Sequence, residues 1–261
     1  MHELKQDQFA SVKHFLPIIK CDTVFAYSIV ENRQKGRILV DDPNDPQTVL
    51  FWHYCGLSVV AGKPDNSEFN SALKRILCRN YEENQRVFLL WVNEEVWNST
   101  VASLLSDSCG VVLKDRIRFR FNRKIFSEKN ISVPDGYELK EIDADIIDRI
   151  EGHIIPSYSW HSSEAFLSEG KGYCLLDGAA VACNSFSSAI GNGILDIGIE
   201  TMQYYRFKGL AAPTAAAMVK YCLDNGFEPS WGCNAENIGS SRIAQSVGFE
   251  IIDSHPMYVS P

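Results

Sequence analysis

The sequence predicts an α+β protein in which an α/β module precedes a domain with a mixed, mostly antiparallel sheet and flanking helices. The length of 261 residues exceeds one ordinary domain of about 100–150 residues and falls short of three. The second half has the order β-α-α-β-β-β-α-β-α-β-β. A polar segment with Pro and Gly, residues 128–138, separates the halves. We therefore expect one module over residues 1–130 and another over 131–261.

The first module is predicted to begin with a helix over residues 3–20. Segments rich in β-branched and aromatic residues predict strands at 24–30, 36–40, 48–54 and 57–61. Apolar residues at helical spacing predict helices at 68–80 and 94–106, on either side of a buried strand at 87–92. This alternation is typical of an α/β module, whose role the sequence does not identify.

Residues 114–124 alternate basic and apolar side chains. The basic positions are Arg116, Arg118 and Arg120, and the apolar ones are Ile117, Phe119 and Phe121. A period of two predicts a strand with the arginines on one face. A half-solvated strand explains this pattern, and contact with an anion, either a cofactor phosphate or an acidic neighbouring surface, is the functional alternative.

The second module is predicted to start with a strand at 137–142, a helix at 144–155 and a helix at 162–168. Ser162 or Ser163 is suited to the N-cap of the latter helix, and Gly170 follows its end. Two strands around Asp177 and Gly178 predict a hairpin with a type I′ turn. Further strands are expected at 193–200, 229–233, 249–254 and 256–260, and helices at 210–225 and 238–247.

Charge is distributed unevenly between the halves. Residues 1–130 carry 18 basic and 16 acidic residues, whereas residues 131–261 carry 7 and 17, so the second half has a net charge of −10. An acidic module repels phosphate backbones and attracts cations. We therefore expect an amine-bearing partner and no nucleic acid. No apolar run approaches the roughly 20 residues of a membrane span, and residues 1–15 lack a signal-peptide core, which predicts a cytoplasmic protein without a membrane partner.

The eight cysteines occur at Cys21, Cys55, Cys78, Cys109, Cys174, Cys183, Cys222 and Cys233. Their spacings form no CxxC pair and place no His at zinc-finger distance from a pair. We expect reduced, buried thiols and no metal site.

A short motif between a predicted strand and a predicted helix carries the chemistry. Arg206, Gly209 and Ala211 form the pattern R-x-x-G-x-A. A loop that enters a helix N-terminus presents N–H groups without intrahelical partners, and the helix dipole adds partial positive charge. Gly209 permits close approach of an anion, and Arg206 and Lys208 add mobile charge. The segment predicts a pyrophosphate cradle, although a Gly-capped core helix has the same pattern.

The second half resembles the GNAT superfamily of acetyl-CoA-dependent N-acetyltransferases. The motif matches the superfamily's Q/R-x-x-G-x-G/A loop, and a downstream segment matches at Asn237, Ser240, Gly248 and Phe249. Trp160 and Phe166 with the sequence GKGYC, and later W-x-C, are similar to the branch that includes zwittermicin A resistance-type acetyltransferases. The resemblance implies a GNAT-like acyl-CoA N-acyltransferase fold over about residues 137–255. The first module is then either a degenerate GNAT-like repeat or an α/β module of another kind.

The resemblance also implies acetyl-CoA as cosubstrate, held in a V between the strands at 193–200 and 229–233. The expected cofactor-binding residues are Ile199, Thr201, Met202, Arg206, Phe207, Lys208, Gly209, Leu210, Ala211, Asn237 and Ser240. Backbone N–H groups near residues 199–202 are expected to polarise the thioester carbonyl.

Two carboxylates on the predicted strand are candidate general bases. Asp196 and Glu200 share one face by the period of two, and Glu200 lies beside the cofactor loop. The structural alternative for Glu200 is a strand-end carboxylate that caps the loop or pairs with Arg206. The Tyr that many superfamily members place four residues before the Gly of Gly-Phe is Ala244 here, so the acid differs. Candidates are Tyr204, Tyr205, Tyr258 and Ser240, or water.

Other chemically capable side chains favour structural roles. His153 and His161 flank the predicted acceptor loop and are interpreted as exposed, with a base as the alternative. Trp160 and Phe166 are interpreted as packing residues and Cys174 and Cys183 as core thiols, with cation contact and covalent catalysis as the respective alternatives.

The sequence thus predicts an N-acetyltransferase that transfers acetyl from acetyl-CoA to a primary amine of a small molecule. The alternatives are a weak or inactive CoA-binding sensory protein, motivated by Ala244, and a protein N-acetyltransferase. The sequence leaves open whether the protein forms a homodimer.

Overall fold

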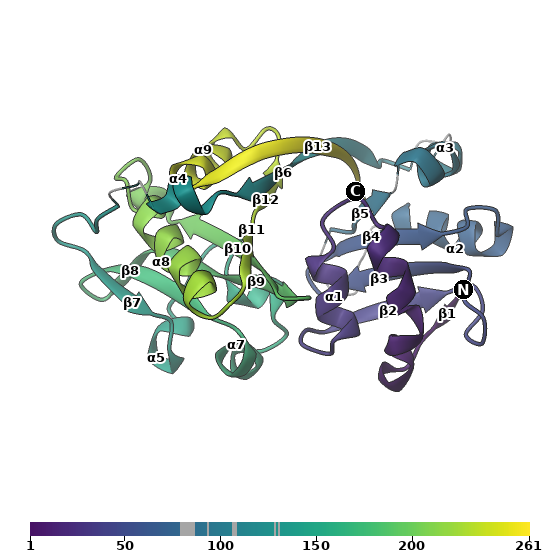
Figure 1. The fold of residues 1–261 in the computed structure, drawn as a ribbon, viewed down its shortest axis with the longest axis horizontal. Coiled ribbons are helices and arrows are strands. Elements are labelled where there is room, and N and C mark those ends of the chain that lie inside the picture. Colours follow the sequence, from purple (N-terminus) through teal and green to yellow (C-terminus); the bar gives the residue numbers. More distant parts are fainter. Residues whose placement is uncertain (79–86, 93, 106–108, 128, 130) are drawn as a thin grey trace. The chain divides into compact units, whose positions relative to one another are not determined.

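The computed structural model describes all residues except 79–86, 93, 106–108, 128 and 130. The chain forms two compact units: the first comprises Met1–Arg116 and Ser254–Pro261, and the second comprises Ile117–Asp253. Strands β6 (Val112–Phe121) and β13 (Phe249–Val259) each contribute residues to both units (Figure 1). The division therefore falls inside β6 rather than near residue 130, and the C-terminal residues return to the first unit.

The first unit contains a mainly antiparallel sheet. Its strands are β1 (His2–Glu3), β2 (Gly36–Val40), β3 (Thr48–His53), β4 (Leu57–Gly62) and β5 (Leu89–Val92). Neighbours pair antiparallel from β1 to β4, β5 runs parallel to β4, and the end of β13 pairs antiparallel with β5. The predicted strands that correspond to β2, β3, β4 and β5 are confirmed. The return of β13 explains why the last residues belong to this unit.

The helices of the first unit are η1 (Gln6–Ile18), α1 (Val24–Val30), α2 (Ser67–Leu77) and α3 (Glu94–Leu104). The N-terminal helix has 3-10 geometry and contains Pro17. The helices predicted at 68–80 and 94–106 are confirmed by α2 and α3, and residues 79, 80 and 106 lie outside the described residues.

The prediction of a strand at 24–30 is wrong, because this segment forms α1. All seven residues of α1 are buried. In a short segment that is buried on every side, apolar residues follow neither the 3.6-residue period of a helix nor the two-residue period of a strand. The β-branched and aromatic content of this segment therefore led to the wrong prediction of a strand.

The second unit is built on a five-stranded sheet in the order β11-β10-β9-β8-β7. Its strands are β7 (Glu138–Glu141), β8 (Gly172–Asp177), β9 (Ala180–Gly191), β10 (Ile194–Thr201) and β11 (Glu228–Ser230). All pairs are antiparallel except β10 with β11, so the predicted mixed, mostly antiparallel sheet with flanking helices is confirmed.

The segment predicted as one strand at 229–233 forms two. Strand β11 ends at Ser230, and β12 (Gly232–Asn234) pairs with β6 instead. Pairing between β10 and β11 stops at Asp196 and Ser230, although β10 continues to Thr201. The two strands therefore diverge beyond this point, which produces the predicted V.

The helical segments of the second unit are α4 (Arg123–Ser127), α5 (Ala144–Ile147), α6 (Pro156–Ser159), α7 (Ser163–Glu169), η2 (Gln203–Tyr205), α8 (Ala211–Asp224) and α9 (Ile238–Ser246). Helix α7 has the predicted cap, since the Ser162 side chain accepts a hydrogen bond from the Ala165 backbone N–H. The helix predicted at 144–155 is shorter and ends at Ile147; farther on, Gly152 with φ +127° and the extended Ile155 before Pro156 are incompatible with a continuous helix. Residues 249–259 form the single strand β13 rather than two strands at 249–254 and 256–260.

The predicted hairpin of β8 and β9 is confirmed, but its turn is not type I′. Asp177 pairs with Ala180, so Gly178 and Ala179 are the central residues. Only Gly178 has positive φ, whereas type I′ requires it at both positions. The pair Asn192-Gly193 between β9 and β10 has positive φ at both residues and is the type I′ turn.

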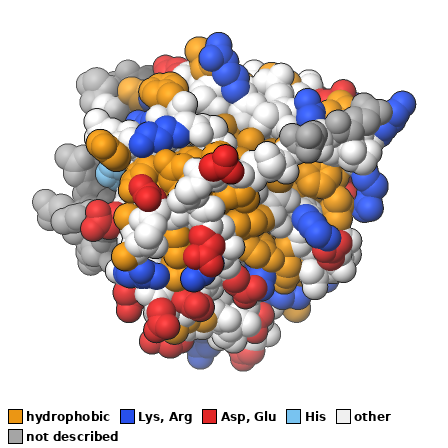
Figure 2. All heavy atoms as spheres, turned by 90° about the vertical axis from the view of Figure 1, so that its left-hand side faces the viewer, with side chains coloured by type: hydrophobic (Ala, Val, Ile, Leu, Met, Phe, Trp, Pro, Cys, Tyr) orange, Lys and Arg blue, Asp and Glu red, His pale blue; other side chains and the backbone are white. Residues whose placement is uncertain are grey.

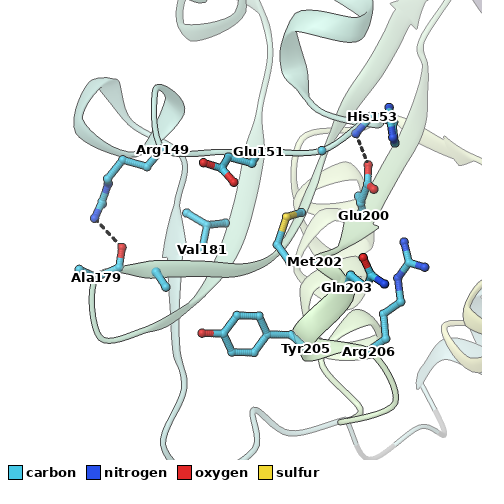
Figure 3. Close-up of a pocket in the computed structure, with 12 residues that line it drawn as sticks. Arg149, Glu151, His153, Ala179, Val181, Glu200, Met202, Gln203, Tyr205 and Arg206 are labelled. Carbon is cyan, nitrogen blue, oxygen red and sulfur yellow. Dashed lines mark hydrogen bonds between the residues drawn. The ribbon is translucent and has the colours of Figure 1, made fainter.

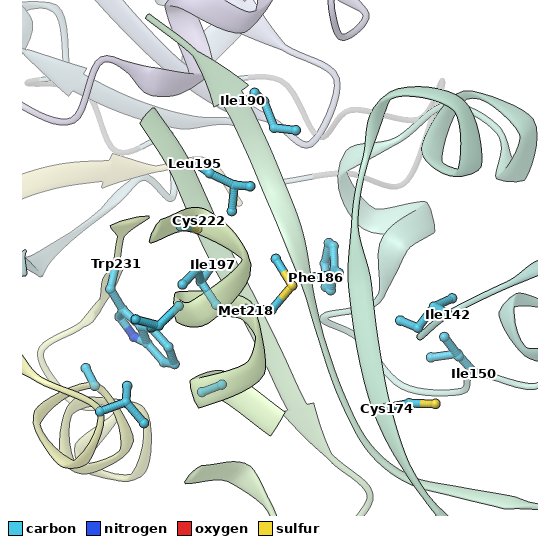
Figure 4. Packing of buried hydrophobic residues seen from close by; sticks show 14 of the residues in the cluster. Ile142, Ile150, Cys174, Phe186, Ile190, Leu195, Ile197, Met218, Cys222 and Trp231 are labelled. Atoms are coloured by element: carbon cyan, nitrogen blue, oxygen red, sulfur yellow. The ribbon is translucent and has the colours of Figure 1, made fainter. Parts of the chain in front are cut away.

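The core of the second unit lies between the sheet and its helices (Figure 4). Met218 and Cys222 of α8 pack there with Ile197 of β10 and Trp231. Phe119 of β6 is buried in the same core, which confirms that the apolar side of residues 114–124 faces inward.

The arginines of β6 contact protein groups rather than a free anion site. Arg118 donates to both carboxylate oxygens of Asp253, at 2.9 and 2.6 Å, and Arg120 approaches Glu250 at 3.7 Å. Arg116 lies over the ring of Trp91. The strand interpretation is confirmed, and the acidic surface is the neighbouring strand β13.

The expectation that all cysteines are reduced is wrong. Cys78 and Cys109 form a disulfide in the first unit, with Cα atoms 4.9 Å apart and a sequence separation of 31. The fold brings them together, which spacing alone does not reveal. Cys21, Cys55, Cys174, Cys183, Cys222 and Cys233 are free and buried, as expected.

Candidate active site

The motif R-x-x-G-x-A lies where expected, between β10 and α8. Phe207 and Gly209 have positive φ, +64° and +78°, so the loop makes two left-handed steps before the helix. A Cβ on Gly209 would meet no atom within 4 Å, so its backbone conformation is what calls for glycine in this structure. Lys208 Nζ lies 4.7 and 4.9 Å from the ring centroids of Tyr204 and Tyr205.

The N-terminus of α8 fits an anion. Its N-cap residue, Leu210, makes no side-chain capping bond, and Pro213 sits in the first turn. The unpaired N–H groups of a 14-residue helix and its dipole favour negative charge at this end. Arg206 is exposed beside it and donates from Nε to the Thr201 carbonyl oxygen at 3.2 Å.

The open edge of β10 presents two of the predicted cofactor-binding residues. The Met202 backbone N–H donates to the Ala182 carbonyl of β9 at 3.0 Å. Because backbone groups alternate along a strand, those of Ile199 and Thr201 point to the opposite edge, beyond the end of pairing with β11. The Met202 N–H is therefore engaged within the sheet, whereas the backbone groups of Ile199 and the N–H of Thr201 face the V; the Thr201 carbonyl already accepts from Arg206.

Glu200 lines a pocket of about 540 Å³ at the end of β10. Figure 3 shows it among residues of the loop at 149–153, the start of β9, and Gln203, Tyr205 and Arg206. Its Oε2 accepts hydrogen bonds from the backbone N–H groups of His153, at 2.7 Å, and Ile154. Glu200 therefore caps the loop at 153–154 rather than the cofactor loop that follows β10, so the predicted capping of the cofactor loop is wrong. Arg206 lines the same pocket.

Asp196 lies elsewhere. It is buried at the position where pairing with β11 ends and the register of β10 with β9 shifts. It does not line the pocket around Glu200. The two candidate bases share a strand face but not a site, which leaves Glu200 as the accessible carboxylate.

The residues considered for proton donation have different surroundings. Ala244 is buried in the core of the second unit, and Tyr258 belongs to the first unit, where its hydroxyl donates to Asn98 Oδ1. Tyr204 is exposed. Tyr205 lines the pocket and donates to Asp177 Oδ2 at 3.1 Å, and desolvation together with that carboxylate raises its pKa.

Asn237 and Ser240 hold helix α9 in place. The Asn237 side chain caps the helix by accepting from the Ser240 N–H at 3.0 Å, and Ser240 Oγ accepts from Trp231 Nε1 at 3.1 Å. Their cofactor contacts stay a prediction beside this structural role.

The structural interpretations of the remaining candidates are confirmed. His153 and His161 are exposed, and Trp160 and Phe166 are buried, with Trp160 Nε1 donating to the Ser187 carbonyl at 2.7 Å. Burial raises the pKa of the Cys174 thiol to about 11 and raises that of Cys183. Thiols in this state are poor nucleophiles near neutral pH.

Sequence reasoning missed the loop that covers Glu200. Arg149, Glu151 and Gly152 line the pocket, and Arg149 Nη1 donates to the Ala179 carbonyl at 2.9 Å. The signal was Gly152 followed by Pro156, which interrupts the helical pattern. A Cβ on Gly152 would lie 2.9 Å from the Glu200 carboxyl carbon, so the close approach requires glycine.

Acidic side chains gather on part of the face shown in Figure 2. From β7 to just after α5, the exposed acidic side chains are Glu138, Glu141, Asp143, Asp145 and Asp148. This agrees with the negative charge of the second half and favours cationic ligands. Among the described residues, no cluster of His, Cys, Asp and Glu has the form of a metal site, and no helix is long and apolar enough to cross a membrane.

Comparisons with known proteins match the whole architecture. A Bacillus subtilis (strain 168) protein described as the uncharacterized N-acetyltransferase YdfB is 28% identical over 262 residues, covering 100% of this chain and 98% of its own. The crystal structure of a GCN5-related N-acetyltransferase-like protein from Streptococcus suis 89/1591 has a TM-score of 0.74 at 22% identity, covering 98% of this chain and 99% of that one.

A tandem GNAT protein from the clavulanic acid biosynthesis pathway has a TM-score of 0.62 at 11% identity, covering 99% and 97% of the two chains. At these identities the solved structures show the fold alone. The sequence model described as GNAT acetyltransferase matches residues 17–258, which include most of the first unit. The chain therefore belongs to the GNAT acetyltransferase family and is an N-acetyltransferase.

Proposed function

We propose that this N-acetyltransferase transfers an acetyl group from acetyl-CoA to the primary amine of a small molecule. The observation that carries the proposal is the pocket that is lined both by the anchored Glu200 carboxylate and by the cofactor-loop residue Arg206. An acidic surface around the second half favours a cationic acceptor.

The residues present fit acetyl-CoA. The uncapped N-terminus of α8, with Arg206 and Lys208 before it, suits a pyrophosphate. The edge of β10 beyond its pairing with β11, at Ile199 and the Thr201 N–H, suits an amide-bearing chain, since extended segments add to free strand edges by backbone hydrogen bonds. These residues would hold the group, whose bound thioester supplies the activated acyl carbon.

The chain's own groups then have distinct tasks. Glu200 takes the proton that leaves the amine nitrogen, directly or through water. A backbone N–H on the open edge of β10 stabilises negative charge on the acyl oxygen. Tyr205 and water are the candidate donors to the leaving thiolate, because Ala244 provides no hydroxyl.

The similarity to the zwittermicin A resistance-type branch supports a small, polar, amine-rich acceptor over a protein. The weak or inactive CoA-binding protein stays the second candidate, favoured by the buried Ala244 in place of a Tyr.

The discriminating experiment is acetyl transfer to a panel of polyamines and aminoglycosides, followed by mass spectrometry of the amine and by CoA release. We expect at least one acetylated amine, and about a hundredfold slower turnover in Glu200→Gln, within the usual range for loss of a general base. The Gln carbonyl still accepts from the loop N–H groups, so binding of acetyl-CoA should persist. Binding without any transfer would favour the sensory protein, and an unchanged rate would remove Glu200 from the mechanism.

A further inference from the structure

Asn184, in the middle of β9, is a buried polar residue that the proposed mechanism does not use. Its side chain has no exposed surface. Within the part of the chain that the structure describes, neither Oδ1 nor Nδ2 has a hydrogen-bond partner. A buried polar group left in that state costs about 1–3 kcal/mol, so such groups usually meet a protein group or an ordered water. The amide therefore points to a small polar partner.

The register of the sheet places Asn184 beside Glu200. Asn184 pairs with Glu200 of β10 on one side and with Cys174 of β8 on the other. Side chains directly opposite each other in an antiparallel pair share a face, with Cβ atoms about 4.5–5.5 Å apart. The amide thus belongs to the same face of the sheet as the candidate base.

The loop at 152–154 closes over this face at Glu200. The backbone N–H groups of His153 and Ile154 bind Glu200 Oε2, as Figure 3 shows for His153. Gly152 packs against the carboxyl group, where a side chain would not fit. The Asn184 amide lies out of solvent, so its partner must be small. A buried water needs about 2–4 polar partners, and the amide with the neighbouring carboxylate provides them.

We propose that Asn184 is a positioning residue whose amide holds one water molecule against the Glu200 carboxylate. The loop N–H groups fix Oε2, and the Asn184-bound water fixes the carboxyl plane from the sheet side. Together they keep the carboxylate turned toward the pocket. This inference rests on the proposed function only in that Glu200 acts on the acceptor amine.

The principal test compares Asn184→Leu with the wild type. Leucine has a similar size and no polar atoms, so it removes the water site without opening a cavity. We expect an unchanged or higher melting temperature, an acetyl-CoA Kd within about twofold, and a kcat about tenfold lower with a smaller change in the amine KM, because a misdirected catalytic group slows the chemical step. Asn184→Ser, which keeps a hydroxyl for the water, should recover part of kcat.

Cys174→Ala is the matched control, because Cys174 occupies the same row and face but pairs with Asn184 rather than with Glu200. It should leave kcat unchanged. An Asn184→Leu variant with wild-type kcat would overturn the proposal. So would a loss of kcat that merely follows a loss of folded protein, since that is the signature of a structural amide.

A high-resolution crystal structure of the wild type provides a test that needs no acceptor. We expect one ordered water within hydrogen-bond distance of the Asn184 amide and the Glu200 carboxylate, absent in Asn184→Leu. A protein partner for the amide, or no water at this position, would refute the inference. If no amine is acetylated, the proposed function fails, and this structural test still decides the role of Asn184.

Discussion

At the scale of single residues, Glu200 uses one carboxyl group both to cap a loop and to line a pocket. Its Oε2 caps the loop at 153–154, while the carboxyl group lines the pocket. The strand period predicted its face, but not the loop that holds it. That loop depends on Gly152 and on contacts 46 and 47 residues apart in sequence, which local patterns do not encode.

Gly209 provides a prediction about the cofactor loop. Its φ of +78° is unfavourable for residues with a Cβ, so Gly209→Ala should lower the free energy of unfolding by about 1–2 kcal/mol and weaken acetyl-CoA binding. Urea unfolding and calorimetry measure the two effects. Gly239→Ala is the control, because Gly239 lies inside α9 without positive φ and its Cβ would sit 3.6 Å from Asn237 Oδ1. Equal behaviour of both variants would contradict a backbone requirement at Gly209.

Buried thiols predict how stability changes with pH. Burial raises the pKa of Cys174 to about 11 and that of Cys222 to about 12. Cysteines in the unfolded chain ionise near pH about 8.5, so the unfolded state loses its thiol protons before the folded state does. Relative to unionised thiols, the folded state therefore has its full stability below that pH and loses stability as the pH rises toward 11–12. Urea unfolding from pH 8 to 10 should show a shallower decline in the Cys174→Ala, Cys222→Ala double variant. An identical decline in the wild type and the double variant would show that these thiols do not cause the pH dependence of stability.

At the scale of elements, the split of residues 228–234 into β11 and β12 creates the V in which the cofactor is proposed to bind. The resemblance to the family implied a V between the strands expected at 193–200 and 229–233. The change of sheet at Trp231 was not predicted, because five residues are too few to show which neighbour each half pairs with. By contrast, the start of α7 at its Ser162 cap and the start of α8 just before Pro213 could be predicted. Helix caps and proline positions depend only on residues that are neighbours in the sequence.

Helix α9 provides a test that separates two roles of Asn237. Asn237→Ala should lower stability by about 1 kcal/mol because the cap is lost, whereas Asn237→Asp keeps an acceptor oxygen and should retain stability. If Asn237 also contacts the cofactor, the Asp variant should bind acetyl-CoA more weakly, since it replaces a donor with a negative charge. Calorimetry of both variants, with exposed Arg242→Ala as the control, decides this; unchanged affinity in Asn237→Asp would assign Asn237 to capping alone.

At the scale of the whole molecule, two strands join the units, and the C-terminus completes the first. Met257–Val259 pair with β5, Tyr258 binds Asn98, and Ser260 Oγ accepts from the Phe88 N–H. Pairing between residues so distant in sequence could not be predicted from local patterns. The acidity of the second half, by contrast, could be counted directly, and it agrees with the exposed carboxylates of β7 and α5.

Removal of residues 254–261 should therefore destabilise the first unit selectively. Calorimetric unfolding should show an earlier transition in the truncated chain, and limited proteolysis should cut within residues 1–116 first. Tyr258→Phe, which removes only the hydrogen bond to Asn98, should have a smaller effect. A single unshifted transition would contradict the assignment of the C-terminus to this unit.

Calorimetric titration with acetyl-CoA tests the central claim most directly. We expect saturable binding by the wild type and weaker binding by Arg206→Ala, which loses a charge at the N-terminus of α8. The Glu200→Gln variant should bind as the wild type does, because Glu200 is assigned to the acceptor amine. No binding of acetyl-CoA at millimolar concentration would contradict the account.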